Sequence, residues 1–255
     1  MAVDATSNAA ASAVSAAHFL ISRRWQCHGR YREPVAERTI EVFADAEEVA
    51  RRAAAFIAER ARAGVARHRA FSLALSGGRT PARMIELLGA EDVPWDSVDV
   101  FQVDERIAPD GHPDRNLTLL EATLPASRIH AMPVNEEFTV AADRYAASLP
   151  DHLGLVHLGL GADGHTASLV PGCAALAIRD RDVALSIEYH GRRRMTLTYP
   201  PIDRAREALW VVTGEDKRDA LKLLLDGDSA IPAAHVMTPR QIVLADRASA
   251  PLTYS

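Results

Sequence analysis

The chain has 255 residues, of which 48% are hydrophobic and 25% are charged, proportions close to those of an average globular protein. Its 29 Lys and Arg residues against 34 Asp and Glu residues give a net charge of −5, which argues against a nucleic-acid binder. The two cysteines, Cys27 and Cys173, form no CxxC pair. They give no zinc signature and no disulfide framework, and they indicate a reducing, cytoplasmic compartment. No apolar run in the sequence approaches the length that spans a bilayer.

The N-terminal segment differs in composition from the rest of the chain. Residues 1–17 are rich in Ala and Ser, and the first charged residue is the acidic Asp4. A secretory signal begins with basic residues, so we predict a loosely ordered extension over residues 1–37 instead. A single domain over residues 38–255 is predicted to follow it.

From about residue 38 the chain alternates between strand and helix patterns. Residues 39–43 alternate polar and apolar side chains like a strand, and Asp45 is placed to cap an alanine-rich helix that continues to about Ala63. Further strands are predicted over residues 70–75, 98–103, 153–158, 183–188, 194–199, 209–213 and 241–245, and further helices over 82–88, 117–122, 138–149 and 215–225. This order predicts an α/β fold, a single-domain Rossmann-like three-layer sandwich with a mostly parallel sheet and helices on both faces.

The turn after residues 153–158 is the centre of the predicted site. It is glycine-rich, carries Asp163 and His165, and leads into Thr-Ala-Ser-Leu, which is predicted to begin a helix. Parallel sheets bind ligands at the carboxyl ends of their strands, and a histidine there can move protons near neutral pH. Asp163 can hold His165 in one tautomer; the alternative is a turn histidine bonded to a nearby carbonyl. His157, inside the apolar run, is predicted to be a core histidine.

Two other chemistries lack their signatures. A metal site at His165 would need a third ligand, and no HxxxH or HExxH spacing supplies one. A serine nucleophile would need a GxSxG turn, which is absent from the sequence.

A second glycine loop, Ser76 to Pro81, follows the predicted strand 70–75. Two glycines allow a sharp turn and close approach of a ligand. Thr80 can cap the next helix, whose N-terminus then attracts a phosphate. The alternative is a plain strand-to-helix turn.

Charged residues follow other strands. Asp104, Glu105 and Arg106 come at the end of the predicted strand 98–103, where they can hold sugar hydroxyls, move a proton or pair with an anion, or form a solvated charged loop. Lys217 lies in a first helical turn, where acids are usually preferred, and this favours a bound anion nearby.

An arginine run, Arg192 to Arg194, begins a predicted strand. Arg194 is expected to point inward because it directly precedes an apolar run. The alternative is an exposed edge strand that its charge keeps soluble.

Together these residues resemble the 6-phosphogluconolactonase family. The resemblance covers most of the chain, from about Arg38 to Ala245, and rests on five stretches: LSGGRTP (75–81), FQVDERIAP (101–109) with Asn116 after it, LGLGADGHTASLVPG (158–172), RMTLTYPPI (194–202) and VVTGEDK (211–217). The same superfamily contains glucosamine-6-phosphate isomerases/deaminases, which share the glycine loop and the DGH turn. Three residues depart from the usual pattern, namely Arg79, Arg115 and Val170.

The resemblance implies hydrolysis of 6-phospho-D-glucono-1,5-lactone in the oxidative pentose phosphate pathway, without metal or organic cofactor. It implies that His165 is the general base, that Asp163 orients it, and that a phosphosugar lactone is the partner. The implied substrate-binding residues are Gly77, Gly78, Arg79, Thr80, Asp104, Arg106, Asn116, Arg194 and Lys217. No nucleic acid or membrane partner is expected, and the protein is expected to be a monomer or a small homo-oligomer.

Two alternatives remain open. A deaminase of this superfamily typically carries an acid soon after the DGH turn, whereas residues 168–171 here are Ser-Leu-Val-Pro. A non-catalytic sugar-phosphate sensor would keep the phosphate-binding residues without turnover.

Overall fold

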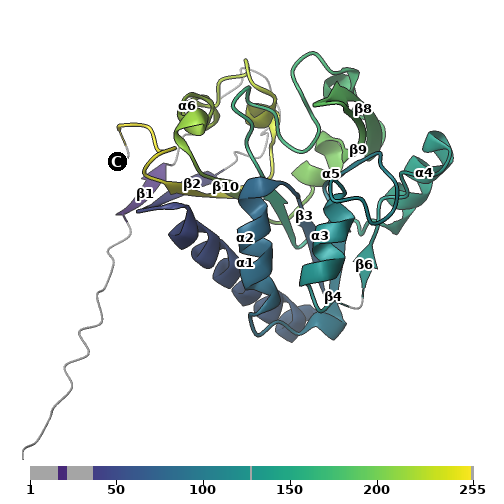
Figure 1. Cartoon of the computed structure of the whole chain (residues 1–255). Coiled ribbons are helices and arrows are strands. Elements are labelled where there is room, and N and C mark those ends of the chain that lie inside the picture. Colours follow the sequence, from purple (N-terminus) through teal and green to yellow (C-terminus); the bar gives the residue numbers. More distant parts are fainter. Residues whose placement is uncertain (1–16, 22–36, 127, 254–255) are drawn as a thin grey trace, which may run out of the picture.

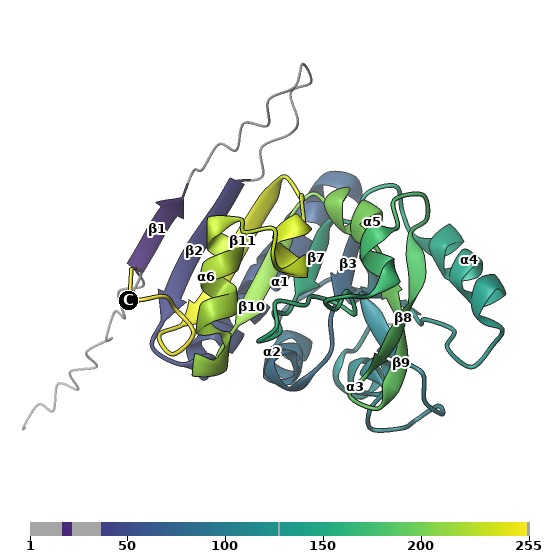
Figure 2. The same ribbon diagram turned by 90° about the horizontal axis from the view of Figure 1, so that it is seen from above.

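The computed structural model describes residues 17–21, 37–126 and 128–253, so most of the predicted N-terminal extension lies outside the described residues. The main sheet has eight strands in the order β1-β2-β11-β10-β7-β3-β4-β6. They are β1 (Ala17–Ile21), β2 (Glu37–Phe43), β11 (Arg240–Asp246), β10 (Ala208–Val212), β7 (Leu155–Leu158), β3 (Phe71–Leu75), β4 (Val98–Gln102) and β6 (Ile129–His130). All neighbours pair in parallel except β1 with β2, and most of them follow one another across Figure 2. The predicted mostly parallel α/β fold is confirmed.

Helices cover both faces of this sheet. α1 (Ala46–His68), α2 (Arg79–Gly89) and α3 (Asn116–Thr123) lie on one side, below the sheet in Figure 1, and α5 (Tyr199–Asp203) and α6 (Arg218–Asp226) lie on the other. α4 (Phe138–Ser148) packs beside the second sheet. No helix in the described part of the chain is both long enough and apolar enough to cross a membrane.

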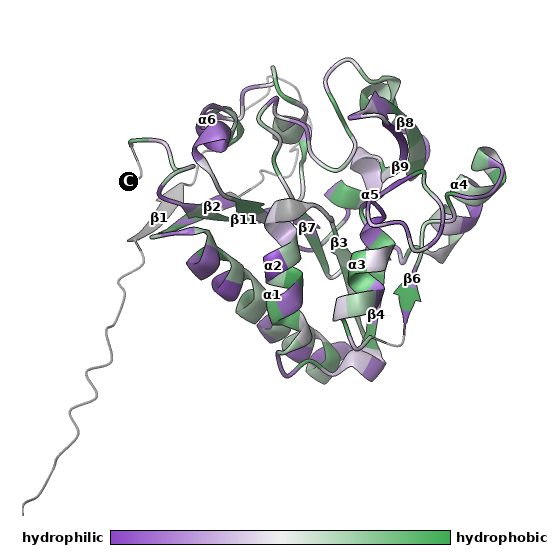
Figure 3. Ribbon diagram, in the orientation of Figure 1, coloured by the Kyte–Doolittle hydropathy of each residue, from purple (hydrophilic) through white to green (hydrophobic). Residues whose placement is uncertain are grey.

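The two faces of the sheet bury separate apolar clusters. The cluster under α1 and α2 includes Ile57 and Leu73, and the cluster on the opposite face includes Tyr199 and Trp210. In Figure 3 the hydrophobic colour runs along the inner strands, whereas α1 and α6 carry hydrophilic stretches. Burial on both faces explains why the central strands read as continuous apolar runs in the sequence.

α1 begins as the sequence predicts. The Asp45 side chain caps it by accepting a hydrogen bond from the Glu48 backbone N–H at 2.9 Å. The helix continues past the predicted end at Ala63 to His68, and Arg69, with φ of 64°, ends it.

A second, antiparallel sheet of three strands was only partly predicted. β8 (Val183–Tyr189) and β9 (Arg192–Leu197), both predicted as strands, form a hairpin, and β5 (Asp104–Arg106) pairs with β9. The solvated charged loop considered for residues 104–106 is therefore wrong, because these residues form a strand. This sheet stands over the carboxyl end of the main sheet (Figure 1).

Candidate active site

A hollow of about 230 Å³ lies at the carboxyl ends of β3, β7 and β10. Nine of the predicted site residues line it, and they come from six separate segments of the chain: Gly77, Gly78, Thr80, Asp104, Arg106, Asn116, His165, Arg194 and Lys217. Asp163 contacts His165 and does not line the hollow itself. The side chain of Arg79 lies outside the described part of the chain.

Asp163 and His165 form a hydrogen-bonded pair. His165 Nδ1 lies 2.5 Å from Asp163 Oδ1, and the His165 backbone N–H donates to the same oxygen at 3.2 Å. An ionised carboxylate only accepts hydrogen bonds, so Nδ1 carries the proton and Nε2 is left as the acceptor of the ring. The alternative of a histidine bonded to a carbonyl is not observed.

The environment of Asp163 favours its charged form. Burial acts to raise the pKa of this carboxyl, but the hydrogen bonds and charge of His165, with a hydrogen bond from Tyr189, lower the pKa below its ordinary value. Gly161 makes room for the pair, since a Cβ there would lie 2.0 Å from His165 Nδ1.

The segment after His165 differs from the prediction. It forms turns with an isolated bridge between Thr166 and Leu169, and no helix begins there. Ala167 has φ of 52°, in the left-handed region that a right-handed helix excludes. The Ser168 backbone N–H donates instead to Thr196 Oγ1 on β9 at 3.1 Å, which ties this turn to the second sheet.

The glycine loop leads into α2, as predicted, but its cap differs. α2 begins at Arg79, and Gly78 occupies the capping position without any side-chain hydrogen bond, so the predicted capping role of Thr80 is wrong. The first backbone N–H groups of a helix have no partner within it. Those of α2 therefore remain available beside the hollow. Gly77 permits close approach of Asn116, whose Oδ1 would lie 2.0 Å from a Cβ at this position.

Asp104 is buried on one side of the hollow. Its Oδ2 accepts a hydrogen bond from Ser168 Oγ at 2.5 Å, and its main-chain carbonyl accepts from Asn116 Nδ2 at 2.8 Å. Burial raises the pKa of Asp104, and the Ser168 hydrogen bond and the charges of Arg194 and Arg106 oppose this rise only in part. Because Asn116 also reaches Gly77, the second sheet and the glycine loop are held together at this point.

Arg194 points inward, as predicted. It is 7% exposed, its Nη1 lies 3.8 Å from Asp104 Oδ2, and its Nη2 donates to the Tyr189 carbonyl at 3.3 Å. Its Nε is buried and has no hydrogen-bond partner among the described residues. Burial lowers the pKa of Arg194 despite the nearby Asp104. A buried guanidinium with incomplete partners is suited to bind an anion.

Lys217 reaches the hollow from the opposite side. It ends a short 3₁₀ turn (Glu215–Lys217) before α6, and its Nζ lies 2.9 Å from the exposed carboxylate of Asp216. The Gly214 backbone N–H donates to both carboxylate oxygens of Asp246 at 3.1 Å, which fixes the loop that carries Lys217.

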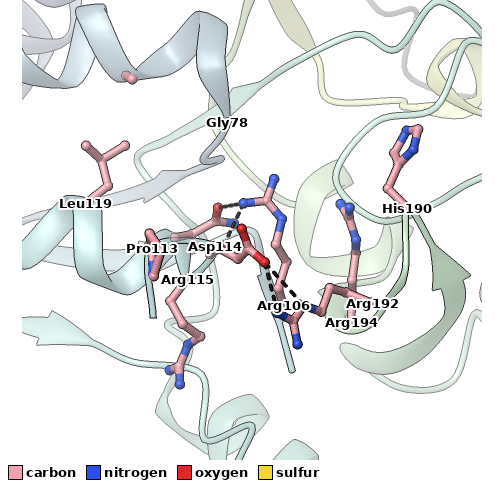
Figure 4. Close-up of a pocket in the computed structure, with 11 residues that line it drawn as sticks. Gly78, Arg106, Pro113, Asp114, Arg115, Leu119, His190, Arg192 and Arg194 are labelled. Carbon is pink, nitrogen blue, oxygen red and sulfur yellow. Dashed lines mark hydrogen bonds and ion pairs between the residues drawn. The ribbon is translucent and has the colours of Figure 1, made fainter. Parts of the chain in front are cut away.

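A wider hollow of about 500 Å³ adjoins the first and shares Arg106 and Arg194 with it. The side chains of Arg106 and Arg192 point toward Asp114, with Arg194 beside them (Figure 4). Arg192 pairs with the Asp114 carboxylate at 3.1 Å, and Arg106 Nη1 donates to the Asp114 carbonyl at 2.6 Å. The combined opening therefore has a cationic wall on this side.

Sequence reasoning missed Glu105 as a residue that supports the site. It is fully buried and accepts the backbone N–H groups of Asn116 and Leu117 at 2.8 and 2.9 Å, so it caps α3. Its Oε2 lies 3.0 Å from Nε of the buried Arg115, one of the departures from the family pattern. No local signal was available, because Glu105 lies 11 residues before the helix that it caps. Tyr189, which donates to Asp163, was missed as well.

The remaining histidine interpretation concerns His157, which lies within β7. His157 is fully buried, and burial lowers its pKa to about 3, so it is an uncharged core histidine as predicted. Its ring nitrogens have no hydrogen-bond partner in the described part of the chain. The described residues contain no group of three or more His, Cys, Asp or Glu side chains arranged to hold a metal ion.

Residues 44–245 match the model of the family described as glucosamine-6-phosphate isomerases/6-phosphogluconolactonase. The chain belongs to this family. A family member from a Nostoc species, named 6-phosphogluconolactonase, is 35% identical over 202 residues, which is 72% of this chain and 84% of that protein. A probable 6-phosphogluconolactonase from Arabidopsis thaliana is 30% identical over 80% of this chain and 86% of its own length.

Solved structures of the family agree with the fold. A 6-phosphogluconolactonase from Shewanella baltica superposes with a TM-score of 0.75 at 23% identity, covering 81% of this chain and 97% of that one. A monomeric glucosamine-6-phosphate deaminase gives a TM-score of 0.70 at 19% identity, covering 82% and 98%. Because the two scores are so close, the fold does not separate the two activities, and the distinction rests on the sequence relatives and the site.

Proposed function

We propose that this chain hydrolyses 6-phospho-D-glucono-1,5-lactone to 6-phospho-D-gluconate, a step of the oxidative pentose phosphate pathway. The observation that carries the proposal is the His165–Asp163 pair, which leaves Nε2 as an acceptor in a hollow that Arg194 and Lys217 also line. A proton acceptor beside a phosphate-binding site fits an uncharged, electrophilic lactone carbonyl on a phosphorylated sugar.

His165 is the general base in this mechanism. Nε2 takes a proton from a water molecule as its oxygen attacks the lactone carbonyl, and the new C–O bond gives a tetrahedral oxyanion. The C–O bond to the ring oxygen then breaks, and Nε2–H returns its proton to that oxygen as it leaves. Asp163 stabilises the imidazolium in between. General acid–base help of this kind contributes about 10²–10⁴-fold.

The phosphate lies between the glycine loop and the two cations. The N-terminus of α2 presents backbone N–H groups and the positive end of the helix dipole beside Gly77 and Gly78. Arg194 supplies a buried guanidinium and Lys217 a point charge from the other side of the hollow. Arg79 and Thr80 belong to the first turn of this helix and are assigned to phosphate binding with it.

The sugar lies along β5. Asp104 and Asn116 present a carboxylate and an amide that are already joined to each other, so their acceptor and donor directions are fixed before a ligand binds. Arg106 lies beside them with its guanidinium on two neutral oxygens, from Asp114 and Asn116. These three residues are assigned to the sugar hydroxyls and the ring.

The small number of carboxylates in the site favours the lactonase activity over the deaminase activity. Ring opening of an amino sugar and proton transfer to a sugar carbon need more acid–base groups than lactone hydrolysis. Ser168, Leu169 and Val170 after the DGH turn are buried and carry no acid. Asp104 is the one carboxylate among the described residues that line the hollow.

Three further properties belong to the same proposal. Residues 38–255 form the lactonase domain, the protein is a monomer or a small homo-oligomer, and it acts in the cytoplasm. The family match over residues 44–245 supports the domain assignment, and the two separated cysteines support the compartment.

Hydrolysis of freshly generated 6-phosphogluconolactone tests the proposal, with the product coupled to its dehydrogenase and buffer alone as the baseline. We expect a rate well above buffer, which His165→Ala lowers by about 10²–10⁴-fold. His68→Ala, at an exposed histidine at the end of α1, is the matched control and keeps the wild-type rate.

The other outcomes discriminate among the alternatives. No rate above buffer, together with turnover of glucosamine-6-phosphate, would identify a deaminase. Binding of 6-phosphogluconate without turnover of either substrate would identify a sensor. A wild-type rate in His165→Ala would remove the assigned base.

A further inference from the structure

Tyr189, the last residue of β8, lies where three parts of the candidate site meet. It lines the hollow, and it directly precedes the tip of the hairpin at His190 and Gly191, where φ is 52° and 72°. The proposed mechanism gives it no role. Apart from a ring contact with its neighbour His190, with centroids 4.1 Å apart, its polar and aromatic contacts go to residues that the mechanism needs: Asp163, His165 and Arg194.

The hydroxyl group of Tyr189 holds the outer oxygen of Asp163. It donates to Asp163 Oδ2 at 3.1 Å, while Asp163 Oδ1 accepts from His165 Nδ1 at 2.5 Å. One oxygen of the carboxylate is thus engaged by its own turn and the other by a strand 26 residues further along the chain. Donors on both oxygens prevent the carboxylate from rotating away from the imidazole.

The ring of Tyr189 contacts His165 and Arg194. It meets the His165 ring edge-on, with the centroids 5.1 Å apart and the planes at 66°. The guanidinium carbon of Arg194 lies 5.5 Å from the centre of the same ring, and the Tyr189 carbonyl accepts from Arg194 Nη2 at 3.3 Å. Contacts of these kinds are favourable and directional. They place the proposed base and the proposed phosphate ligand against one rigid side chain.

We propose that Tyr189 is a positioning residue that fixes Asp163, and through it the Nδ1–H tautomer of His165, while its ring and carbonyl set the place of Arg194. The inference rests on the proposed function, because it concerns the base and the phosphate ligand assigned there. In this proposal the hydroxyl group of Tyr189 affects kcat and its ring affects substrate binding. Variants that remove one group or both distinguish the two roles.

Tyr189→Phe removes the hydroxyl group and keeps the ring. We expect kcat to fall about tenfold with KM changed by less than about twofold, because the base loses orientation while Arg194 keeps its ring contact. Tyr189→Leu removes both groups, so kcat falls and KM rises as well.

The pH profile supplies a readout that a merely structural role would not move. Without the Tyr189 hydroxyl, the Asp163 carboxylate spends less time hydrogen-bonded to the imidazole and stabilises the His165 imidazolium less. The acid limb of the kcat/KM profile therefore moves down by about half a pH unit. The other ionisable groups that face this hollow are Asp104, Arg106, His190, Arg194 and Lys217, and all of them are present in both variants.

Tyr199→Phe is the matched control. It removes a tyrosine hydroxyl group that donates to the Pro232 carbonyl at 2.8 Å, away from the hollow. We expect a lower Tm with unchanged kcat, KM and pH profile. An equal loss of kcat in Tyr199→Phe and Tyr189→Phe, or a lower kcat in Tyr189→Phe with an unmoved acid limb, would overturn the proposal.

Nitrogen-15 spectra of histidine-labelled protein without substrate separate this inference from the proposed function. The signal of His165 among the 10 histidines is identified by its loss in His165→Ala. We expect the Nδ1–H tautomer in the wild type and a mixture of tautomers in Tyr189→Phe. A mixture already present in the wild type would overturn both the pair and the role of Tyr189. A pure Nδ1–H tautomer in both proteins would overturn the role of Tyr189 alone.

Discussion

Two segments bring carboxylates to this site, and their surroundings differ. The turn after β7 carries Asp163 and His165, whose side chains are 36% and 22% exposed. β5 carries Asp104 and Glu105, whose side chains are 7% and 0% exposed. Asp163 receives hydrogen bonds only from His165 and Tyr189 among the described residues. Glu105 receives them from three backbone N–H groups and Gln102, and pairs with Arg115.

This difference in exposure distinguishes a carboxylate that serves catalysis from one that serves folding. A carboxylate that is partly open to solvent can be replaced at little cost to folding, because water solvates whatever it leaves behind. A buried carboxylate that accepts many hydrogen bonds cannot be replaced without a large cost to folding. Its removal leaves the positive charge of its partner and several N–H groups buried without a partner. We therefore expect substitutions on the turn to act on turnover and substitutions of Glu105 to act on stability.

The largest expected effect is on folding. Glu105→Ala leaves the buried Arg115 with only the exposed Asp110 as a carboxylate partner among the described residues, and it uncaps α3. We expect the free energy of unfolding to fall by about 3–5 kcal/mol in urea denaturation. Glu47→Ala is the control, because Glu47 is a more exposed acid that pairs with Arg51 and Arg83, and solvent-exposed pairs contribute little to stability. Equal losses in the two variants would contradict the comparison.

The next effect is on turnover. Asp163→Asn keeps the shape of the side chain but removes the charge that stabilises the His165 imidazolium. We expect kcat to fall about a hundredfold, which corresponds to about 2.7 kcal/mol of barrier, with the free energy of unfolding nearly unchanged. Asp143→Asn, at an exposed position on α4, is the control and keeps the wild-type rate. A large loss of stability in Asp163→Asn would assign this turn to the framework instead.

Local patterns were enough to predict most of the main sheet. Alternation and apolar runs depend on neighbours in the sequence, and they located β2, β3, β7, β10 and β11 within about two residues. The resemblance to a known family added the full set of site residues, nine of which line one hollow. Those that follow β3, β7 and β10 meet there because parallel strands end at the same edge of a sheet, whereas Asp104, Arg106 and Arg194 reach the hollow from the second sheet.

The sequence predictions that failed have a common cause: each of these residues is positioned by a contact with a residue far away in the sequence. Ser168 was predicted within a helix, but its backbone N–H bonds Thr196 and its hydroxyl bonds Asp104, 64 residues away. Ala167 is held in a left-handed conformation that alanine rarely adopts on its own. Tyr189 reaches Asp163 only because the hairpin folds over the turn. No local pattern encodes such contacts.

A smaller effect is expected for phosphate binding. Lys217→Ala removes one of the two cations assigned to the phosphate, while the glycine loop and Arg194 remain. We expect KM to rise about tenfold with kcat little changed, since the phosphate is remote from the reacting carbonyl. Lys222→Ala, at a more exposed lysine on α6, is the control and leaves KM unchanged. An unchanged KM in Lys217→Ala would place the phosphate elsewhere in the opening.

The smallest effect is a difference in pH dependence between the two aspartates. The pKa of Asp163 is lowered in the folded protein, chiefly by His165 against the opposing effect of burial, so its contribution to stability is present above the ordinary pKa of about 4 and is lost as pH falls. The pKa of Asp104 is raised by burial, so its contribution is greatest below about pH 4 and is lost as pH rises through the raised pKa. Between about pH 4 and pH 7, we expect the stability difference between wild type and Asp163→Asn to be constant once the pH is about one unit above that ordinary pKa. We expect the difference for Asp104→Asn to decrease as pH rises from about 4. Urea denaturation across this range measures both, and parallel curves for the two variants would show that burial does not distinguish these carboxylates.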